Sequence, residues 1–364
     1  MELNQTPMRT SKNYNINNIK VKSAFFDENN ENKPVYNQKM AKNCEFKKFS
    51  VKYKNFYYEN LQSDNSEEKF DFYLSEELKN QSRNNYNFSN TFNFNEKIDE
   101  PIKISFDFDS ENNVLVDNIT LNFKSGSSSK IILKYSSLSE LLNYNNELLK
   151  INLDEDASAE IVLVYDLGQS SENYVTIESN INKNANLNLM IVDFSSKNSI
   201  FNYNSKLLGE NAKSETDCLY LGFGDSTIDF NILSQIFSPN STSKIDVVGT
   251  LSDNAKKNFK GTIDFKKGSK KSFGTEDEYC MLLSKKAKSK ALPMLLCNEE
   301  DVDGKHSSSV GKVDEKQLFY IMSRGLSYSE AVKLIIKTKF NKIISKIFDE
   351  ELKNEIIEKI DAKI

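Results

Sequence analysis

Short segments of alternating apolar and polar residues recur between positions 100 and 292, and they constrain the fold more than any other feature. They include PIKISFDFD, NVLVDNITLNF, SKIILKYS, AEIVLVYD, ANLNLMIVDF, DCLYLGF, KIDVVGTL and FKGTIDF. In the first segment Ile104, Phe106 and Phe108 alternate with polar residues, which is typical of a β-strand with one buried face. Gly, Asn, Asp and Ser separate the segments. The pattern therefore predicts a long series of short strands.

Helical patterns are nearly absent from this region, and LSELLNYNNELLK (138–150) is the one clear helix that we expect there. Strands without intervening helices exclude a doubly wound sheet and leave a sandwich, a barrel or a β-helix. Hairpin turns of the Asn-Gly type are missing, and aliphatic residues occupy similar places in successive segments. These two features favour the β-helix over the sandwich.

The two ends of the chain differ from the middle. Residues 1–95 have a mixed pattern, which predicts an α/β region with a helix over SEEKFDFYLSEELKN (66–80). After Asp314 the apolar period becomes helical and predicts a bundle of three or four helices. This bundle is too small for a core of its own, so we expect it to dock on the β domain, on a partner, or on both.

The helix boundaries near the C-terminus have clear signals. Gly325 is expected to end the first helix, and Ser327 with Glu330 three residues later forms a candidate capping box. Asp349 is placed to cap the last helix.

Charge and hydropathy limit the class of protein. The chain has 48 Lys and Arg against 53 Asp and Glu, and the resulting net charge of -5 argues against nucleic-acid binding, which needs a concentrated basic face. No apolar run approaches the ~20 residues of a membrane span. The opening MELNQTPMRTSKNYN has no hydrophobic signal region. We therefore expect a cytoplasmic protein that does not associate with membranes.

The four cysteines, Cys44, Cys218, Cys280 and Cys297, are widely separated and form no CxxC pair. In a reducing compartment this spacing predicts free thiols rather than a zinc or iron–sulfur site built within the chain. Cys280 and Cys297 lie beside apolar runs, in EYCMLL and PMLLCNEE, so we expect both to be buried and inert.

His306 is the only histidine, and it lies in the polar stretch DVDGKHSSSVGKVD (301–314), which we expect to be a loop. One interpretation is a loop histidine that hydrogen-bonds nearby backbone. The other is a metal ligand, since neutral imidazole binds iron and acidic residues precede it. KHSSSVGK lacks the GxxxxGK[ST] arrangement, so no nucleotide site is predicted in this chain.

The stretch LFYIMSRG contains Phe319, Tyr320, Met322 and Arg324. Its aromatic residues, methionine and arginine suit an interface anchor, but they also suit a packed helix core. The pattern leaves both readings open.

The segment ALPMLLCNEEDVDGKHSSSVGKVDEKQLFYIMSRGLSYSEAVKLII (291–336) resembles the C-terminal signature of the SufB/SufD family, the scaffold proteins of the SUF system for iron–sulfur cluster assembly. The matching residues are Pro293, Asp301-Val302, His306, Ser307 to Ser309, Gly311, Val313-Asp314, Leu318-Phe319-Tyr320 and Ser323-Arg324-Gly325. Upstream, FKGTIDFKKGS and MLLSKKAKSKALP match further family segments. The opening LNQTPMRT is similar to that of SufD-type members.

This resemblance implies a mainly β fold with a right-handed parallel β-helix core (96–313), a mixed N-terminal region (1–95) and a C-terminal helical domain (314–364). It also implies a non-catalytic scaffold subunit that pairs with a SufB-like partner. A SufC-like ABC ATPase would hydrolyse ATP and dock on the helical domain, with Phe319, Tyr320, Arg324 and Gly325 as candidate partner-binding residues.

By the same resemblance, His306 is the candidate ligand of iron or of a transient iron–sulfur cluster at the partner interface. Many family members have a cysteine two residues before this histidine, in the form K-C-S-H. Here that position is Gly304, in D-G-K-H. We therefore expect any thiolate at this site to come from elsewhere.

Three alternatives stay open. The chain could be a shortened SufB paralogue that acts as a homodimer. It could be a β-helix protein that binds or degrades polysaccharide, although such proteins are usually exported and carry carboxylate clusters. It could also be a general protein-interaction solenoid if the match at 291–336 is coincidental.

Overall fold

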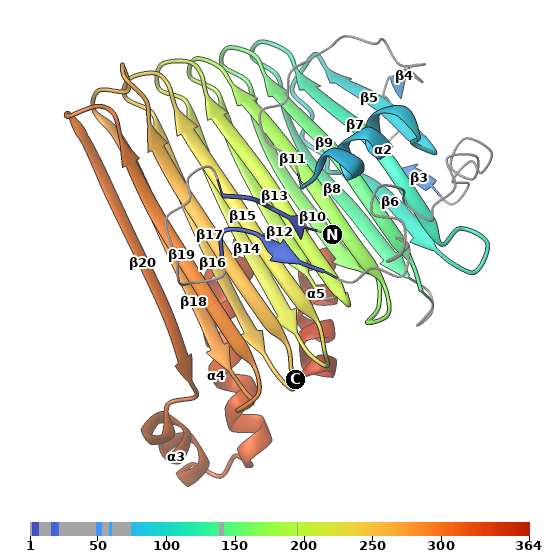
Figure 1. Ribbon diagram of the computed structural model, residues 1–364, viewed down its shortest axis with the longest axis vertical. Coiled ribbons are helices and arrows are strands. Elements are labelled where there is room, and N and C mark those ends of the chain that lie inside the picture. Colours follow the sequence, from blue (N-terminus) through green and yellow to red (C-terminus); the bar gives the residue numbers. More distant parts are fainter. Residues whose placement is uncertain are drawn as a thin grey trace.

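The computed structural model describes residues 2–6, 16–21, 49–52, 58–59, 74–137, 142–194 and 196–364. Successive strands alternate between two facing sheets, so each coil of the chain adds one strand to each sheet. Within the described ranges each sheet has nine strands, and the strands from β5 onward pair in parallel. The fold is a parallel β-solenoid (Figure 1), which confirms the predicted β-helix core.

The two sheets are named here sheet I and sheet II. Sheet I contains β3 (Phe49–Lys52), β6 (Ile102–Phe108), β8 (Ser128–Ser137), β10 (Ser158–Asp166), β12 (Asn186–Asp193), β14 (Lys213–Gly222), β16 (Thr242–Leu251), β18 (Ser272–Leu282) and β20 (Val302–Lys312). Sheet II contains β4 (Tyr58–Glu59), β5 (Phe88–Phe94), β7 (Val114–Phe123), β9 (Tyr144–Leu153), β11 (Glu172–Ile181), β13 (Asn198–Leu207), β15 (Thr227–Ile236), β17 (Lys256–Phe265) and β19 (Lys288–Cys297). The short strands β3 and β4 are antiparallel to their neighbours β6 and β5.

The interior of the solenoid is filled by the alternating apolar residues. Ile104, Phe106 and Phe108 are fully buried, as their alternation predicts. Equivalent positions in neighbouring coils are register partners, so similar side chains stack along the solenoid axis. The rings of Phe106, Tyr135 and Tyr165 form one such stack, with centroids 4.8 and 5.1 Å apart.

One series of turns between coils uses left-handed backbone at Asp156, Asn184 and Asn211, with φ of 61°, 55° and 58°. Aspartate and asparagine tolerate this conformation better than other residues with a side chain. The side-chain amides also connect the coils, because Asn184 donates to Asp156 at 2.9 Å and Asn211 donates to Asn184 at 3.0 Å.

The outer face of sheet II is covered by N-terminal elements (Figure 1): β1 (Glu2–Leu3), β2 (Ile19–Lys20) and α2 (Glu76–Asn84). Helix α2 confirms the last part of the helix predicted over 66–80, whereas 66–73 lies outside the described residues. Gln81 on α2 accepts a hydrogen bond from the Tyr144 hydroxyl at 2.6 Å, and this contact holds the helix against β9.

Three helices follow the solenoid, in agreement with the predicted bundle: α3 (Glu315–Ser323), α4 (Tyr328–Ile344) and α5 (Glu350–Lys363). The capping box of Ser327 and Glu330 is present, and Asp349 caps α5 by accepting from the Leu352 amide at 2.8 Å. Gly325 has a φ of 101° just after α3, a left-handed conformation that suits glycine. All three predicted boundary signals are confirmed.

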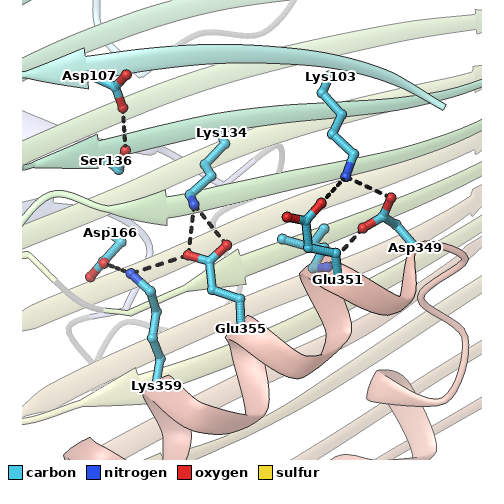
Figure 2. Close-up of polar contacts among 10 residues, drawn as sticks. Lys103, Asp107, Lys134, Ser136, Asp166, Asp349, Glu351, Glu355 and Lys359 are labelled. Atoms are coloured by element: carbon cyan, nitrogen blue, oxygen red, sulfur yellow. Dashed lines mark hydrogen bonds and ion pairs between the residues drawn. The ribbon is translucent and has the colours of Figure 1, made fainter. Parts of the chain in front are cut away.

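Helices α4 and α5 cover the outer face of sheet I, where their apolar residues pack on those of the strands. Ion pairs along α5 reinforce this contact (Figure 2): Lys103 lies 2.8 Å from Glu351, and Lys134 lies 2.7 Å from Glu355. The expectation that the helical bundle docks on the β domain is therefore confirmed for α4 and α5. Helix α3 lies beyond the end of the sheets (Figure 1).

The helix predicted over 138–150 is wrong where the structure describes that segment, because Tyr144–Leu153 forms strand β9. The stretch is rich in leucine, glutamate and asparagine, and both faces of the strand are buried, so no alternating pattern marks it. Pairing with β7 on one side and β11 on the other overrides the local propensity.

Candidate functional site at the open end of the solenoid

Strands β19 and β20 form the last coil, and we call this end of the solenoid the open end. Among the described residues, each of the two strands pairs on one side only, with β17 and β18 respectively. The predicted loop at 301–314 is wrong for most of its length, since Val302–Lys312 is a strand of 11 residues. The side chains of β20 are exposed or half-buried. His306 thus lies on a regular edge strand.

The interior column that ends at His306 changes its chemistry near the open end. Residues in one column are register partners in successive coils, so their side chains share the interior face of sheet I. From the first coils to the last, the column reads Ile131, Ile161, Leu189, Thr216, Ile245, Glu276 and His306. A mostly aliphatic core therefore gives way to a carboxyl group and an imidazole in the last two coils.

Glu276 is fully buried, and neither of its carboxylate oxygens has a hydrogen-bond partner among the described residues. Burial raises the pKa of Glu276 to about 8, and the nearby charges of Glu278 and Asp277 raise it further. The carboxylate points toward sheet II, where a Cβ on Gly261 would lie 2.2 Å from Glu276 Oε1. The glycine therefore leaves the space that this side chain occupies.

Glu278 is also buried, but it has partners. Its Oε1 lies 2.5 Å from the Lys257 ammonium group, and both side chains are fully buried. Its Oε2 accepts a hydrogen bond from the Ser308 hydroxyl at 2.7 Å. Lys257 also lies 5.9 Å from the ring centroid of Tyr220. The charge of Glu278 is compensated, which distinguishes it from Glu276.

Gly304 faces the same interior as His306. A Cβ there would lie 3.2 Å from Phe265 Cε2 and 3.3 Å from Leu295 Cδ1. A cysteine at this position would therefore direct its thiol into the open end, and this chain has none there. Within the ranges the structure describes, no group of three or more His, Cys, Asp or Glu side chains is arranged to hold a metal ion.

The cysteines are placed differently from one another. Cys280 and Cys218 are buried, so the expectation for Cys280 is confirmed. Burial raises the pKa of the Cys280 thiol, and nearby Lys257 acts in the opposite direction. The expectation for Cys297 is wrong, because this residue is exposed at the end of edge strand β19. Cys44 lies outside the described residues.

Helix α3 carries an exposed aromatic surface. Phe319 is 75% exposed and Tyr320 is 59% exposed. The Arg324 guanidinium lies 5.2 Å from the Tyr320 ring centroid and donates to its hydroxyl at 3.0 Å. No residue of α3 is buried, which favours the interface reading of LFYIMSRG over a core reading. This exposed aromatic surface on α3, defined by Phe319, Tyr320 and Arg324, is separate from the column at His306.

Together these features define a parallel β-solenoid protein with a docked helical pair and a polar, unpaired terminal coil. A family model described as the SUF system FeS cluster assembly SufBD core domain matches residues 106–339. The chain belongs to this family, as the resemblance at 291–336 predicts.

Curated proteins named for iron–sulfur cluster assembly are similar to this chain. The chain is 31% identical over 160 residues to the iron–sulfur cluster assembly protein SufD of Bacillus subtilis (strain 168), covering 44% of this chain and 37% of that protein. It is 24% identical over 250 residues to an iron–sulfur cluster assembly SufBD family protein of Staphylococcus epidermidis (strain ATCC 12228), covering 66% of this chain and 52% of the relative. The matches thus span about half or less of the relatives' length.

Sequence reasoning missed Glu276, Glu278 and Lys257. A signal for the first two was present in the stretch GTEDEYC, because strict alternation back from the buried Cys280 places Glu278 and Glu276 on the interior face. The burial of Lys257 follows from its pairing with Glu278 in another coil, which no local pattern indicates.

Proposed function

We propose that this chain is a SufD-like scaffold subunit of a SUF complex for iron–sulfur cluster assembly, without catalytic activity of its own. In this proposal it pairs with a SufB-like subunit and binds a SufC-like ABC ATPase in the cytoplasm. The observation that carries the proposal is the terminal coil, whose outer edge is unpaired within the described chain and whose strand β20 carries His306. In the described ranges, no helix is both long and apolar enough to cross a membrane.

The open end supports pairing through the solenoid. Strands β19 and β20 have 10 and 11 residues, and each leaves one row of backbone N–H and C=O groups unpaired within the described chain. Such edges are templates for strand addition. A partner with a similar edge would continue both sheets across the interface. A second copy of this chain is the alternative partner, and the mass of the purified complex distinguishes the two.

The aromatic surface on α3 supports ATPase docking. Aromatic residues and arginine are enriched among residues that dominate binding energy. The domain division proposed with this function is 1–95, 96–313 and 314–364, and it places α3 in the helical domain that faces the ATPase. Gly325 contributes by ending α3 so that this surface stays separate from α4.

The interior face at His306 supports a role as ligand of iron or of a transient cluster. Because Gly304 provides no thiolate, sulfur ligands would come from the partner. The cluster is the cargo of the complex in this proposal and not a resident cofactor of this chain.

The first experiment is affinity purification from the native host, followed by anaerobic iron and sulfide analysis. Recovery of a SufB-like subunit and an ABC ATPase is expected, and purification of the chain alone would contradict the proposal. Hydrogen exchange should show that the β20 amides slow in the complex. His306→Ala should abolish cluster formation with the complex intact, whereas Lys305→Ala on the outward face should not. Full cluster formation by His306→Ala would reject the ligand role.

A second experiment tests the α3 surface. Phe319→Ala and Arg324→Ala should lower ATPase recovery while the SufB-like partner is retained. Phe237→Ala is the matched control, since Phe237 is an exposed aromatic residue that directly follows β15 of sheet II and is not part of α3. Unchanged ATPase recovery with both α3 variants would reject docking at this surface.

A further inference from the structure

The carboxylate of Glu276 needs a partner that the described chain does not provide. A buried, ionised carboxylate without a hydrogen bond or counter-ion is costly, so such groups are paired, bind metals or stay protonated, and in the free chain Glu276 is protonated at neutral pH. Glu278, two residues away on the same interior face, has both a lysine and a serine as partners. Glu276 has no such partner among the described residues. Most other residues in the same column are aliphatic, so packing of the solenoid interior does not require a carboxyl group at this position.

The position of Glu276 indicates what its partner is. Its register partner is His306, on a neighbouring strand about 4.8 Å away. Both residues belong to the interior column, and only the terminal strand separates Glu276 from the open end. An imidazole nitrogen and a carboxylate oxygen are donors that suit ferrous iron, for which mixed histidine and carboxylate sites are typical.

We propose that Glu276 is a second iron ligand, which together with His306 forms the half of a ferrous-iron site that this chain contributes at the open end. The remaining ligands come from the partner subunit that covers the edge. This inference rests on the proposed function, and it adds a residue from the penultimate coil and a donor set of oxygen and nitrogen. The site binds iron as cargo, and binding of the ion releases the proton that burial holds on the Glu276 carboxyl group in the free chain.

The test is anaerobic titration of Fe(II) into the full chain, alone and in the purified complex, for the wild type and three variants. Glu276→Gln keeps the size of the side chain and removes its charge. We expect it and His306→Ala each to weaken Fe(II) binding about tenfold or more. Asp277→Asn is the matched control, because Asp277 is adjacent in sequence but faces outward and accepts from Ser307. This control should bind like the wild type.

Iron-edge X-ray absorption gives a second readout. The imidazole scattering should disappear in His306→Ala and persist in Glu276→Gln, which should lose an oxygen ligand. Thermal melting of each variant confirms that it is folded. The inference is overturned if Glu276→Gln binds Fe(II) like the wild type, or if the wild type binds none in either form.

The two proposals fail in different ways. If the complex copurifies and assembles clusters normally with Glu276→Gln, the iron-ligand role of Glu276 is wrong and the scaffold function stands. If Fe(II) binding depends on Glu276 but no SufB-like or ATPase partner is recovered, the scaffold function is wrong and the iron site stands.

Discussion

The ammonium group of Lys346 lies 2.7 Å from a carboxylate oxygen of Asp217, although the two residues are 129 positions apart. Lys346 follows α4, and Asp217 lies on β14, so this ion pair joins the helical region to the outer face of sheet I. Burial raises the pKa of Asp217 to about 6, and the hydrogen bond from Lys346 acts in the opposite direction. The contact between the helical region and sheet I therefore depends on the charges of Lys346 and Asp217.

We predict that Lys346→Met lowers the free energy of unfolding by about 2 kcal/mol at pH 8, because it leaves the buried Asp217 carboxylate without its counter-ion. The figure is below that for a fully buried pair because the Lys346 side chain is 33% exposed. The loss should shrink below pH 6, where Asp217 is protonated in the folded state. Denaturant unfolding at pH 5 and pH 8 measures both effects.

The control for this prediction is Lys342→Met. Lys342 also pairs with a sheet I carboxylate, Asp246, but its side chain is 53% exposed. Solvent screening should limit its effect to about 0.5 kcal/mol. Equal losses for the two variants would show that the burial of Asp217 is not the cause.

Glu147→Gln should stabilise the protein at pH 8. Glu147 is a register partner of Asp117 in the solenoid interior, and burial raises its pKa to about 7, although a hydrogen bond from Tyr165 lowers it. Between pH 4.5 and 7 the unfolded chain therefore binds fewer protons at this position, and stability falls as the pH rises. The glutamine removes this loss, roughly 3 kcal/mol for a shift of this size.

Melting temperatures from pH 4.5 to 8 test this prediction. The difference between Glu147→Gln and the wild type should grow with pH and level off above pH 7. A difference that is constant across this range, or one that decreases with rising pH, would contradict the raised pKa.

Gly304→Ala should fold and cost about 1 kcal/mol, because the new methyl group crowds the flexible ends of Phe265 and Leu295. Gly304→Cys, which places a thiol at this position, should cost a similar amount. If a partner subunit covers the open end as proposed, the thiol of this variant should react slowly in the complex and faster in the free chain. Equal rates would argue against partner binding at this end.

Thiol labelling should separate the cysteines, once Cys44 has been replaced by serine to remove its contribution. Cys297 is exposed and should react in the folded protein. Cys218 and Cys280 are buried, and burial raises the pKa of both thiols, so they should react only after unfolding. Rapid reaction of a second thiol in the folded state would show that the interior opens locally.

Local sequence features predicted much of the architecture. Alternation indicated the strands of the solenoid, and the inward positions of Ile104, Phe106 and Phe108 are confirmed. Capping signals gave the ends of the C-terminal helices, and Phe319 and Tyr320 are exposed as an interface reading requires. These features depend on residues close together in the chain, so the sequence carries them directly. The family motif indicated His306 as a candidate ligand by the same kind of local signal, and that role stays a prediction.

Tertiary structure decided the rest. Residues 144–150 are a strand because β7 and β11 pair with them on both sides, and Cys297 is exposed because its strand is the last in its sheet. The register that places Glu276 beside His306 depends on the number of residues in one coil, which no local pattern fixes. Local sequence patterns determined most of the strands and the C-terminal helices, but not β9 and β20, for which the same patterns predict a helix and a loop. Only the stacking of coils determined which residues lie side by side at the open end, because those register partners are far apart in the chain.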